Sequence, residues 1–121
     1  MFAEVNGAKL YYEIVGEGKP VLTMHGGPGI GDHQDNKKMF GDFEDLAQFV
    51  YYDMRGSGKS SHHEADTYTH DVFCQDAEAL RQELGLGMIA IGGGSYGGIL
   101  ALEYALRYQR NVTRILLRGT A

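Results

Sequence analysis

The order of apolar and polar residues divides the chain into short strand patterns and longer helical patterns. Two apolar runs, residues 1–5 and 8–15, flank Asn6-Gly7, a dipeptide that favours the tight turn of a β-hairpin. Apolar runs typical of further strands occupy residues 20–24, 49–52, 88–92 and 112–118. Apolar residues at helical spacing predict helices over residues 37–48, 69–84 and 96–108.

Individual residues support one of these helix predictions and weaken another. Thr69 is a suitable N-cap, and Asp71 in the first turn suits the positive end of the helix. Gly85 is a suitable C-terminal stop. Gly41 lowers the stability of the first helix by about 1 kcal/mol relative to alanine. Strands that alternate with helices predict an α/β fold: a mostly parallel sheet, helices on both faces and an antiparallel hairpin at the N-terminal edge.

Composition excludes several classes of protein. With 121 residues, 43% of them hydrophobic and 22% charged, the chain fits one globular domain. A net charge of −5 argues against nucleic acid as a partner. No apolar run approaches the ~20 residues of a membrane span, and no signal peptide is visible. Because Cys74 is the single cysteine, we expect it to be a packing residue in a reducing, cytoplasmic setting.

Two glycine motifs suggest phosphate binding. Gly58, Lys59 and Ser60 match the end of a Walker A loop, but Asp53 stands where its first glycine should be, and a carboxylate repels phosphate. The glycines of a dinucleotide motif, G-x-G-x-x-G, also occur, at Gly92, Gly94 and Gly97. That motif usually lies in the first strand–helix–strand unit, whereas two strand–helix units precede it here.

A third interpretation of the same glycines is nucleophilic. Gly93, Ser95 and Gly97 fit G-x-S-x-G, in which a serine stands on a sharp turn between a strand and a helix. Acyl transfer at such a serine needs two N–H donors for the oxyanion. One comes from the residue after the serine and one from a glycine-rich loop that follows an earlier strand. The segment HGGPG, residues 25–29, stands where that loop is expected.

Together, HGGPG, YDMRGSGKS and GGSYGGILALEYALRY resemble the proline iminopeptidase family of α/β hydrolases in order and spacing. The resemblance implies that Ser95 is the nucleophile and that Gly27 and Tyr96 are the oxyanion donors. It also implies supporting roles in the surrounding loops for His25, Gly26, Pro28, Gly29, Asp53, Arg55, Gly93, Gly94 and Gly97. Tyr96 stands where the family often has tryptophan, which leaves the substrate class open.

The catalytic partners of Ser95 are not visible in the sequence. In this fold the acid and the histidine follow the serine, yet no aspartate or histidine follows Ser95, and Glu103 lies inside the next predicted helix. A rearranged triad would have to use a histidine that precedes the serine: His25, His33, His62, His63 or His70. We therefore expect residues 1–121 to be the N-terminal part of a hydrolase core domain, without its cap and C-terminal strands, and inactive alone.

The expected activity of the complete protein is release of N-terminal proline from small peptides through an acyl-enzyme on Ser95. An esterase or lactonase of the same fold is the alternative enzyme. A truncated half-domain that associates with itself through an exposed edge at Val112–Arg118 is the non-enzymatic alternative. The sequence shows no metal-ligand cluster, and we expect neither a metal nor another cofactor.

Overall fold

The computed structural model describes residues 1–27 and 29–119, and within them six strands form one sheet. The strands are β1 (Phe2–Val5), β2 (Ala8–Val15), β3 (Pro20–Met24), β4 (Gln48–Tyr52), β5 (Ile89–Gly94) and β6 (Val112–Arg118). Their order across the sheet is β1-β2-β4-β3-β5-β6. The hairpin β1–β2 and the pair β2–β4 are antiparallel, whereas β4, β3, β5 and β6 are parallel. The predicted fold class is confirmed.

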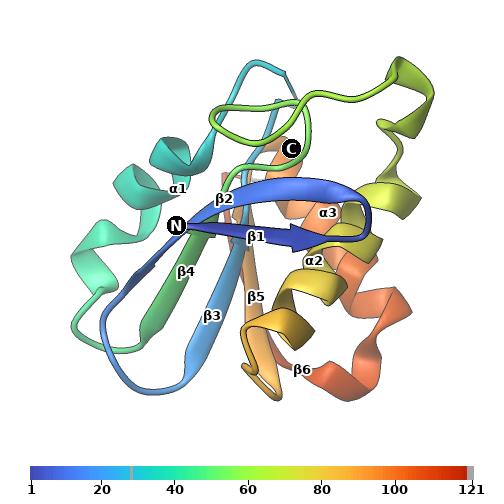
Figure 1. Ribbon diagram of the computed structural model, residues 1–121. Helices are drawn as coiled ribbons and strands as arrows, with labels where there is room; N and C mark the ends of the chain where they lie inside the picture. The colour runs from blue at the N-terminus through green and yellow to red at the C-terminus, as the bar shows by residue number, and fades with distance from the viewer. Residues whose placement is uncertain (28, 120–121) are drawn as a thin grey trace.

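Helices cover both faces of the sheet (Figure 1). The structure has α1 (His33–Phe40), α2 (His70–Glu83) and α3 (Tyr96–Arg107), with short 3₁₀ turns η1 (Gly41–Phe43), η2 (Ala65–Thr67) and η3 (Gln109–Asn111). One face packs against α2 and α3 through the larger apolar cluster, and the other packs against α1 through a smaller one. Full burial of a large aliphatic side chain such as Leu22, Ile91 or Leu100 contributes about 1.5–3 kcal/mol.

The first helix is where the prediction from apolar spacing was wrong. α1 runs over His33–Phe40 instead of residues 37–48. Asp32 sets its start, because the Asp32 side chain accepts a hydrogen bond from Gln34 N at 2.9 Å and the Asp35 side chain accepts one from Asp32 N at 3.1 Å. After Phe40 the chain tightens into η1, and Leu46 is 74% exposed. The apolar residues after Gly41 therefore do not form a buried helical face.

The other predicted elements are confirmed to within a few residues. The hairpin turn has positive φ at Asn6 (50°) and Gly7 (77°), as its tight type requires. Thr69 caps α2 by accepting from Val72 N at 3.1 Å. β5 continues to Gly94, two residues beyond its predicted end. Cys74 is buried in the larger cluster, and burial raises the pKa of its thiol to about 11, in agreement with a packing role.

The strand β6 lies at the edge of the described sheet. Ile115 and Leu117 point to one of its faces and remain 41% and 43% exposed. Among the described residues, no helix has the length and apolar character needed to cross a membrane.

Candidate active site

Ser95 occupies the turn between β5 and α3, and its backbone angles are unusual. The residue has φ 55° and ψ −130°, a left-handed conformation that a non-glycine residue adopts at a cost of about 1–3 kcal/mol. Its side chain is exposed at the carboxyl end of β5. The Ser95 N–H is held by the Arg118 carbonyl at 3.3 Å. The predicted strand–turn–helix with a strained serine is confirmed.

Close backbone contacts explain the glycines on either side of Ser95. A Cβ added at Gly93 would lie 2.6 Å from the Gly97 carbonyl carbon, and one added at Gly97 would lie 2.8 Å from the carbonyl carbon of His25. Real Cβ atoms essentially never approach other heavy atoms within 3.0 Å. The turn around Ser95 therefore closes only because both positions lack a side chain.

The glycine loop after β3 lies against the first turn of α3. A Cβ at Gly26 would be 3.3 Å from both Tyr96 N and Gly97 N, so the loop and the start of the helix are in contact. Backbone N–H groups in the first turn of a helix have no acceptor within the helix, and they carry its positive end. Two elements expected of an oxyanion site are thus neighbours. The direction of the Gly27 N–H stays a prediction, and Pro28 lies outside the described residues.

His25 ties this loop to the loop after β4. Its Nε2 accepts a hydrogen bond from Met54 N at 3.0 Å, so Nδ1 carries the proton and donates to the Gly26 carbonyl at 2.9 Å. The ring is buried, and desolvation by burial lowers the pKa of His25. A neutral imidazole with a hydrogen bond at each ring nitrogen holds the glycine loop in position.

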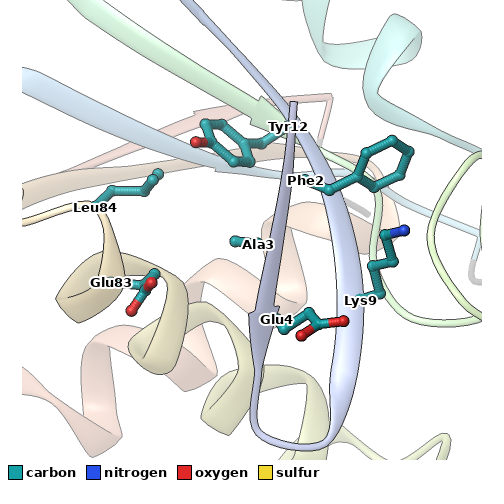
Figure 2. A pocket seen from close by; sticks show the side chains of 7 residues that line it. All are labelled: Phe2, Ala3, Glu4, Lys9, Tyr12, Glu83 and Leu84. Carbon is teal, nitrogen blue, oxygen red and sulfur yellow. The ribbon is translucent and has the colours of Figure 1, made fainter.

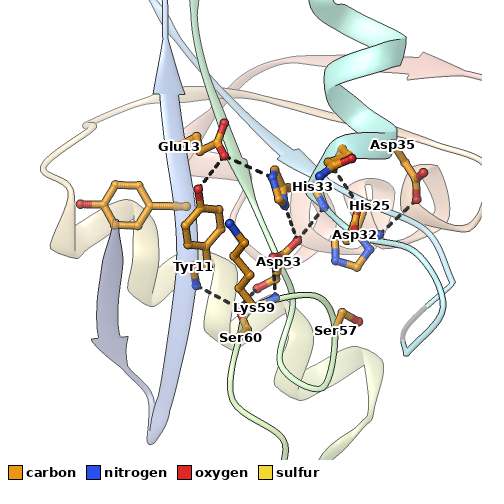
Figure 3. A network of polar contacts seen from close by, with 12 residues as sticks. Tyr11, Glu13, His25, Asp32, His33, Asp35, Asp53, Ser57, Lys59 and Ser60 are labelled. Carbon is orange, nitrogen blue, oxygen red and sulfur yellow. Dashed lines mark hydrogen bonds and ion pairs between the residues drawn. The ribbon is translucent and has the colours of Figure 1, made fainter.

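Asp53 is the centre of a buried polar network (Figure 3). Its carboxylate accepts from His33 N at 2.6 Å, contacts His33 Nδ1 at 2.8 Å and accepts from Lys59 N at 2.9 Å. The far side of the His33 ring lies 3.3 Å from Glu13. The turn that resembled the end of a Walker A loop is therefore wrapped around a carboxylate, which argues against phosphate binding there.

Arg55 has a structural partner that sequence reasoning missed. Asp76 on α2 pairs with it through both carboxylate oxygens, at 2.6 Å to Nε and 2.8 Å to a terminal nitrogen. Asn6 in the hairpin turn also donates to Asp76, at 2.8 Å. The sequence feature that could have indicated this pair is Asp76 itself, a carboxylate on the same apolar helical face as Phe73 and Leu80.

The contacts that Ser57 and Ser60 make were not predicted from the sequence. Ser57 Oγ accepts a hydrogen bond from Gly29 N at 2.8 Å, so the loop after β4 holds the glycine loop in place. Ser60 Oγ accepts from Tyr11 N at 2.9 Å and donates to the Asp53 carbonyl. Both side chains connect the segment after β4 to its neighbours, and short polar residues in a glycine-rich loop carry no distinct pattern that predicts such contacts.

The histidines have partners other than Ser95. Besides His25 and His33, His63 Nε2 contacts Ser61 Oγ at 2.6 Å, while His62 is exposed. His70 contacts the Tyr96 hydroxyl through Nε2 and lies 2.9 Å from Glu103 through Nδ1. Within residues 1–27 and 29–119, no hydrogen bond joins a histidine to the Ser95 hydroxyl.

One cluster has the residue types of a metal site, although the sequence showed no such pattern. Ligand atoms of Asp32, His33 and Asp53 lie within 4.8 Å of one another. Asp32 already accepts from Gln34 N, and Asp53 accepts from His33 N and Lys59 N. Because hydrogen-bond donors of the protein occupy these oxygens, we interpret the cluster as part of the network in Figure 3.

An open pocket of about 560 Å³ lies between the hairpin and the end of α2 (Figure 2). Its lining includes Phe2, Glu4, Lys9, Tyr12 and Leu84. No described residue of the serine turn or the glycine loop lines it. The candidate active site is therefore the exposed serine at the carboxyl end of the sheet.

Comparison with known proteins decides the family. The profile of the alpha/beta hydrolase fold matches residues 19–121. The chain belongs to the α/β-hydrolase family. Proline iminopeptidase PfmaB of Pestalotiopsis fici is 40% identical over 99% of this chain, and the proline iminopeptidase of Xylella fastidiosa strain 9a5c is 41% identical over 92%. The resemblance seen in the sequence motifs is confirmed.

Solved structures of α/β hydrolases superpose closely on this fold. The proline iminopeptidase-related protein of Thermus thermophilus has a TM-score of 0.90 at 30% identity and covers 99% of this chain. The meta-cleavage product hydrolase of Pseudomonas fluorescens has a TM-score of 0.89, also at 30% identity. The chain spans 43% and 36% of the two curated relatives and 44% and 45% of the two structures.

Proposed function

We propose that the complete gene product carrying this sequence is a serine hydrolase that releases N-terminal proline from peptides, with Ser95 as its nucleophile. The observation that carries the proposal is the geometry of Ser95. The residue is exposed at the end of the parallel strand β5, and its backbone is held at φ 55°. The substrate class rests on the curated relatives, which are proline iminopeptidases at about 40% identity.

In this proposal Ser95 Oγ attacks the carbonyl carbon of the N-terminal prolyl residue and loses its proton to a general base. The Gly27 and Tyr96 N–H groups stabilise the oxyanion, and each such donor typically contributes about 3 kcal/mol. The protonated base then gives its proton to the leaving amine, which leaves a prolyl ester on Ser95. Water attacks this ester with the help of the same base, and free proline and the serine hydroxyl are regenerated.

We propose that the general base and its acid are not among residues 1–121. Where the structure describes the histidines, their ring nitrogens have other partners or solvent. Residues 1–121 then form the front part of the core domain. On its own this chain would lack the triad base, which lowers turnover on the order of a million-fold.

An esterase of the same fold is the second candidate. A thermophilic esterase from Thermogutta terrifontis superposes on the whole chain with a TM-score of 0.86 at 28% identity. Tyr96, where proline iminopeptidases often have tryptophan, leaves the acyl group open. The non-enzymatic candidate is a self-associating half-domain with β6 at its interface.

Each of these three candidate functions is placed in a reducing, cytoplasmic compartment, because the one cysteine, Cys74, is buried and forms no disulfide.

The test compares hydrolysis of a proline anilide with that of a short acyl ester by the complete gene product. We expect kcat/KM to be higher for the anilide, and Ser95→Ala to abolish hydrolysis and labelling by a fluorophosphonate. Ser61→Ala removes a hydroxyl that bonds Lys9 N and serves as the matched control, with activity retained. A preference for the ester supports the second candidate, and hydrolysis that survives Ser95→Ala contradicts the assignment of the nucleophile.

A further inference from the structure

Three polar side chains meet beside the turn that holds Ser95. Tyr96 and Glu103 are seven residues apart on α3, a spacing that places both on one face of the helix. His70 is the first residue of α2, which packs next to α3 on the same face of the sheet (Figure 1). The imidazole of His70 lies between the other two side chains, with Nε2 at the Tyr96 hydroxyl and Nδ1 2.9 Å from Glu103 Oε2.

The surroundings of Glu103 determine where the His70 proton lies. Glu103 Oε2 is buried and accepts no hydrogen bond of good geometry from a described residue. The Arg107 guanidinium stands 4.0 Å from this oxygen and also pairs with Asp71. A carboxylate oxygen accepts only, and His70 Nδ1 lies 2.9 Å from it, so the negative charge of Glu103, rather than an aligned hydrogen bond, favours a proton on Nδ1. In a neutral ring Nε2 is then the acceptor, and the Tyr96 hydroxyl is its donor.

Tyr96 connects this cluster to the catalytic geometry. Its backbone N–H is the proposed oxyanion donor that follows Ser95, and its Cβ lies 3.4 Å from the position a Cβ would take on Gly26. The Tyr96 ring also packs edge-on to His70, with ring centroids 5.4 Å apart. Any rotation of the Tyr96 side chain about its Cα–Cβ bond would break the contact with His70.

We propose that Tyr96, His70 and Glu103 form a positioning relay. Glu103 keeps the proton of a neutral His70 on Nδ1, and His70 Nε2 accepts a hydrogen bond from the Tyr96 hydroxyl. The Tyr96 side chain is thereby fixed, and the Tyr96 N–H stays directed toward the substrate oxygen. The relay rests on the proposed function, because it supports the oxyanion donor of that reaction. All three are positioning residues, and none takes part in bond making. The side chains of His70 and Glu103 are 36% and 33% exposed, so the cluster is partly accessible to solvent.

The first test reads the tautomer and does not depend on activity. The complete gene product is labelled with ¹⁵N at its histidines, and the signals of His70 are assigned by their loss in His70→Gln. We expect the neutral ring to carry its proton on Nδ1 in the wild type and in Tyr96→Phe, because Glu103 remains. In Glu103→Gln the population is expected to move toward Nε2–H. A wild-type ring protonated on Nε2 overturns the relay as stated.

The second test is kinetic and uses the proline anilide. Tyr96→Phe keeps the ring and removes the hydroxyl, and we expect kcat to fall about 3- to 10-fold, the range of one lost hydrogen bond, with KM changed less than about twofold. Glu103→Gln is expected to lower kcat in the same direction. The double variant should be no slower than Tyr96→Phe, because both changes break one network. Tyr12→Phe, a hydroxyl removal on β2, is the matched control with unchanged kcat.

The outcomes separate the relay from the proposed function. An unchanged kcat in Tyr96→Phe, or losses that multiply in the double variant, overturns the positioning role while Ser95-dependent hydrolysis stands. A wild-type protein without Ser95-dependent hydrolysis overturns the proposed function and, with it, the catalytic consequence of the relay. The tautomer then still decides whether the three side chains are connected as the structure shows.

Discussion

Gly97→Ala tests the close packing that lets the chain turn at Ser95. The added methyl group would point at the backbone where β3 ends, with the carbonyl carbons of Met24 and His25 at 2.9 and 2.8 Å. Both atoms belong to the main chain, and Met24 is in register with Gly93 of β5. The neighbour therefore cannot move aside without shifting a central strand.

The magnitude follows from two opposing effects. Forcing a methyl group into a closely packed region costs about 1–3 kcal/mol. Replacing glycine by alanine in a helix gains up to about 1 kcal/mol, but less near the first turn, where Gly97 lies. We expect the free energy of unfolding to fall by about 2 kcal/mol, and the displacement of the glycine loop to lower hydrolysis by the complete gene product as well.

Two matched substitutions separate crowding from backbone conformation. Gly41 has φ −57° and open space around its Cβ position, so Gly41→Ala is expected to be neutral or slightly stabilising. Gly85 also has open space but φ 63°, so Gly85→Ala reports the cost of a left-handed residue alone, about 1 kcal/mol. The assay is urea unfolding of the complete gene product. Equal stability of Gly97→Ala and Gly41→Ala would refute the role given to close packing.

Three further predictions concern charge and the sheet edge. Hydrogen bonds from Lys37 and Tyr11 lower the pKa of Glu13 from 4.5 to about 2, so its contribution to stability is complete above pH 4.5 and is lost as the pH falls through 2. Acid unfolding curves should therefore be flatter in this window for Glu13→Gln than for the exposed control Glu17→Gln. Asp76→Asn leaves the buried Arg55 without its counter-charge and is expected to cost about 3–5 kcal/mol in urea unfolding, whereas Asp66→Asn should cost almost nothing. The 121-residue chain should form dimers or larger species through β6 in light scattering, and a monomer whose β6 amides are protected from hydrogen exchange would contradict this.

Most of the fold could be predicted because local pattern and tertiary environment agree. The parallel strands β3, β4 and β5 are continuous apolar runs, as expected of strands covered on both faces. Asn6-Gly7 and Thr69 act through their own backbone neighbours, so their effects are visible in the sequence. The prediction of the first helix failed because local pattern and tertiary environment disagree there. Its start depends on a capping box at Asp32, while the exposed Leu46 continued a helical spacing that no tertiary contact uses.

The candidate site could be predicted only in part. The glycine pattern indicated where Ser95 stands, because a strained turn restricts residue type at fixed positions along the chain. The pairings of Arg55 with Asp76 and of His33 with Asp53 join residues about 20 positions apart, and such partners follow from the packing of helices on the sheet. The same holds for His70, whose contact with Tyr96 depends on how α2 lies against α3.

Several buried polar side chains, among them His25, Asp53 and Ser57, lie at the carboxyl end of the sheet, and their contacts join the loops there. His25 joins the loop after β3 to that after β4, and Ser57 joins the same two loops through Gly29. Gly26 brings the first of them against the N-terminus of α3. The His25 and Ser57 side chains each accept a hydrogen bond from a backbone N–H, so moving one of these two loops leaves a polar group of the other without its partner. A strained serine persists only where its surroundings over-determine the backbone, and this network supplies that constraint around Ser95.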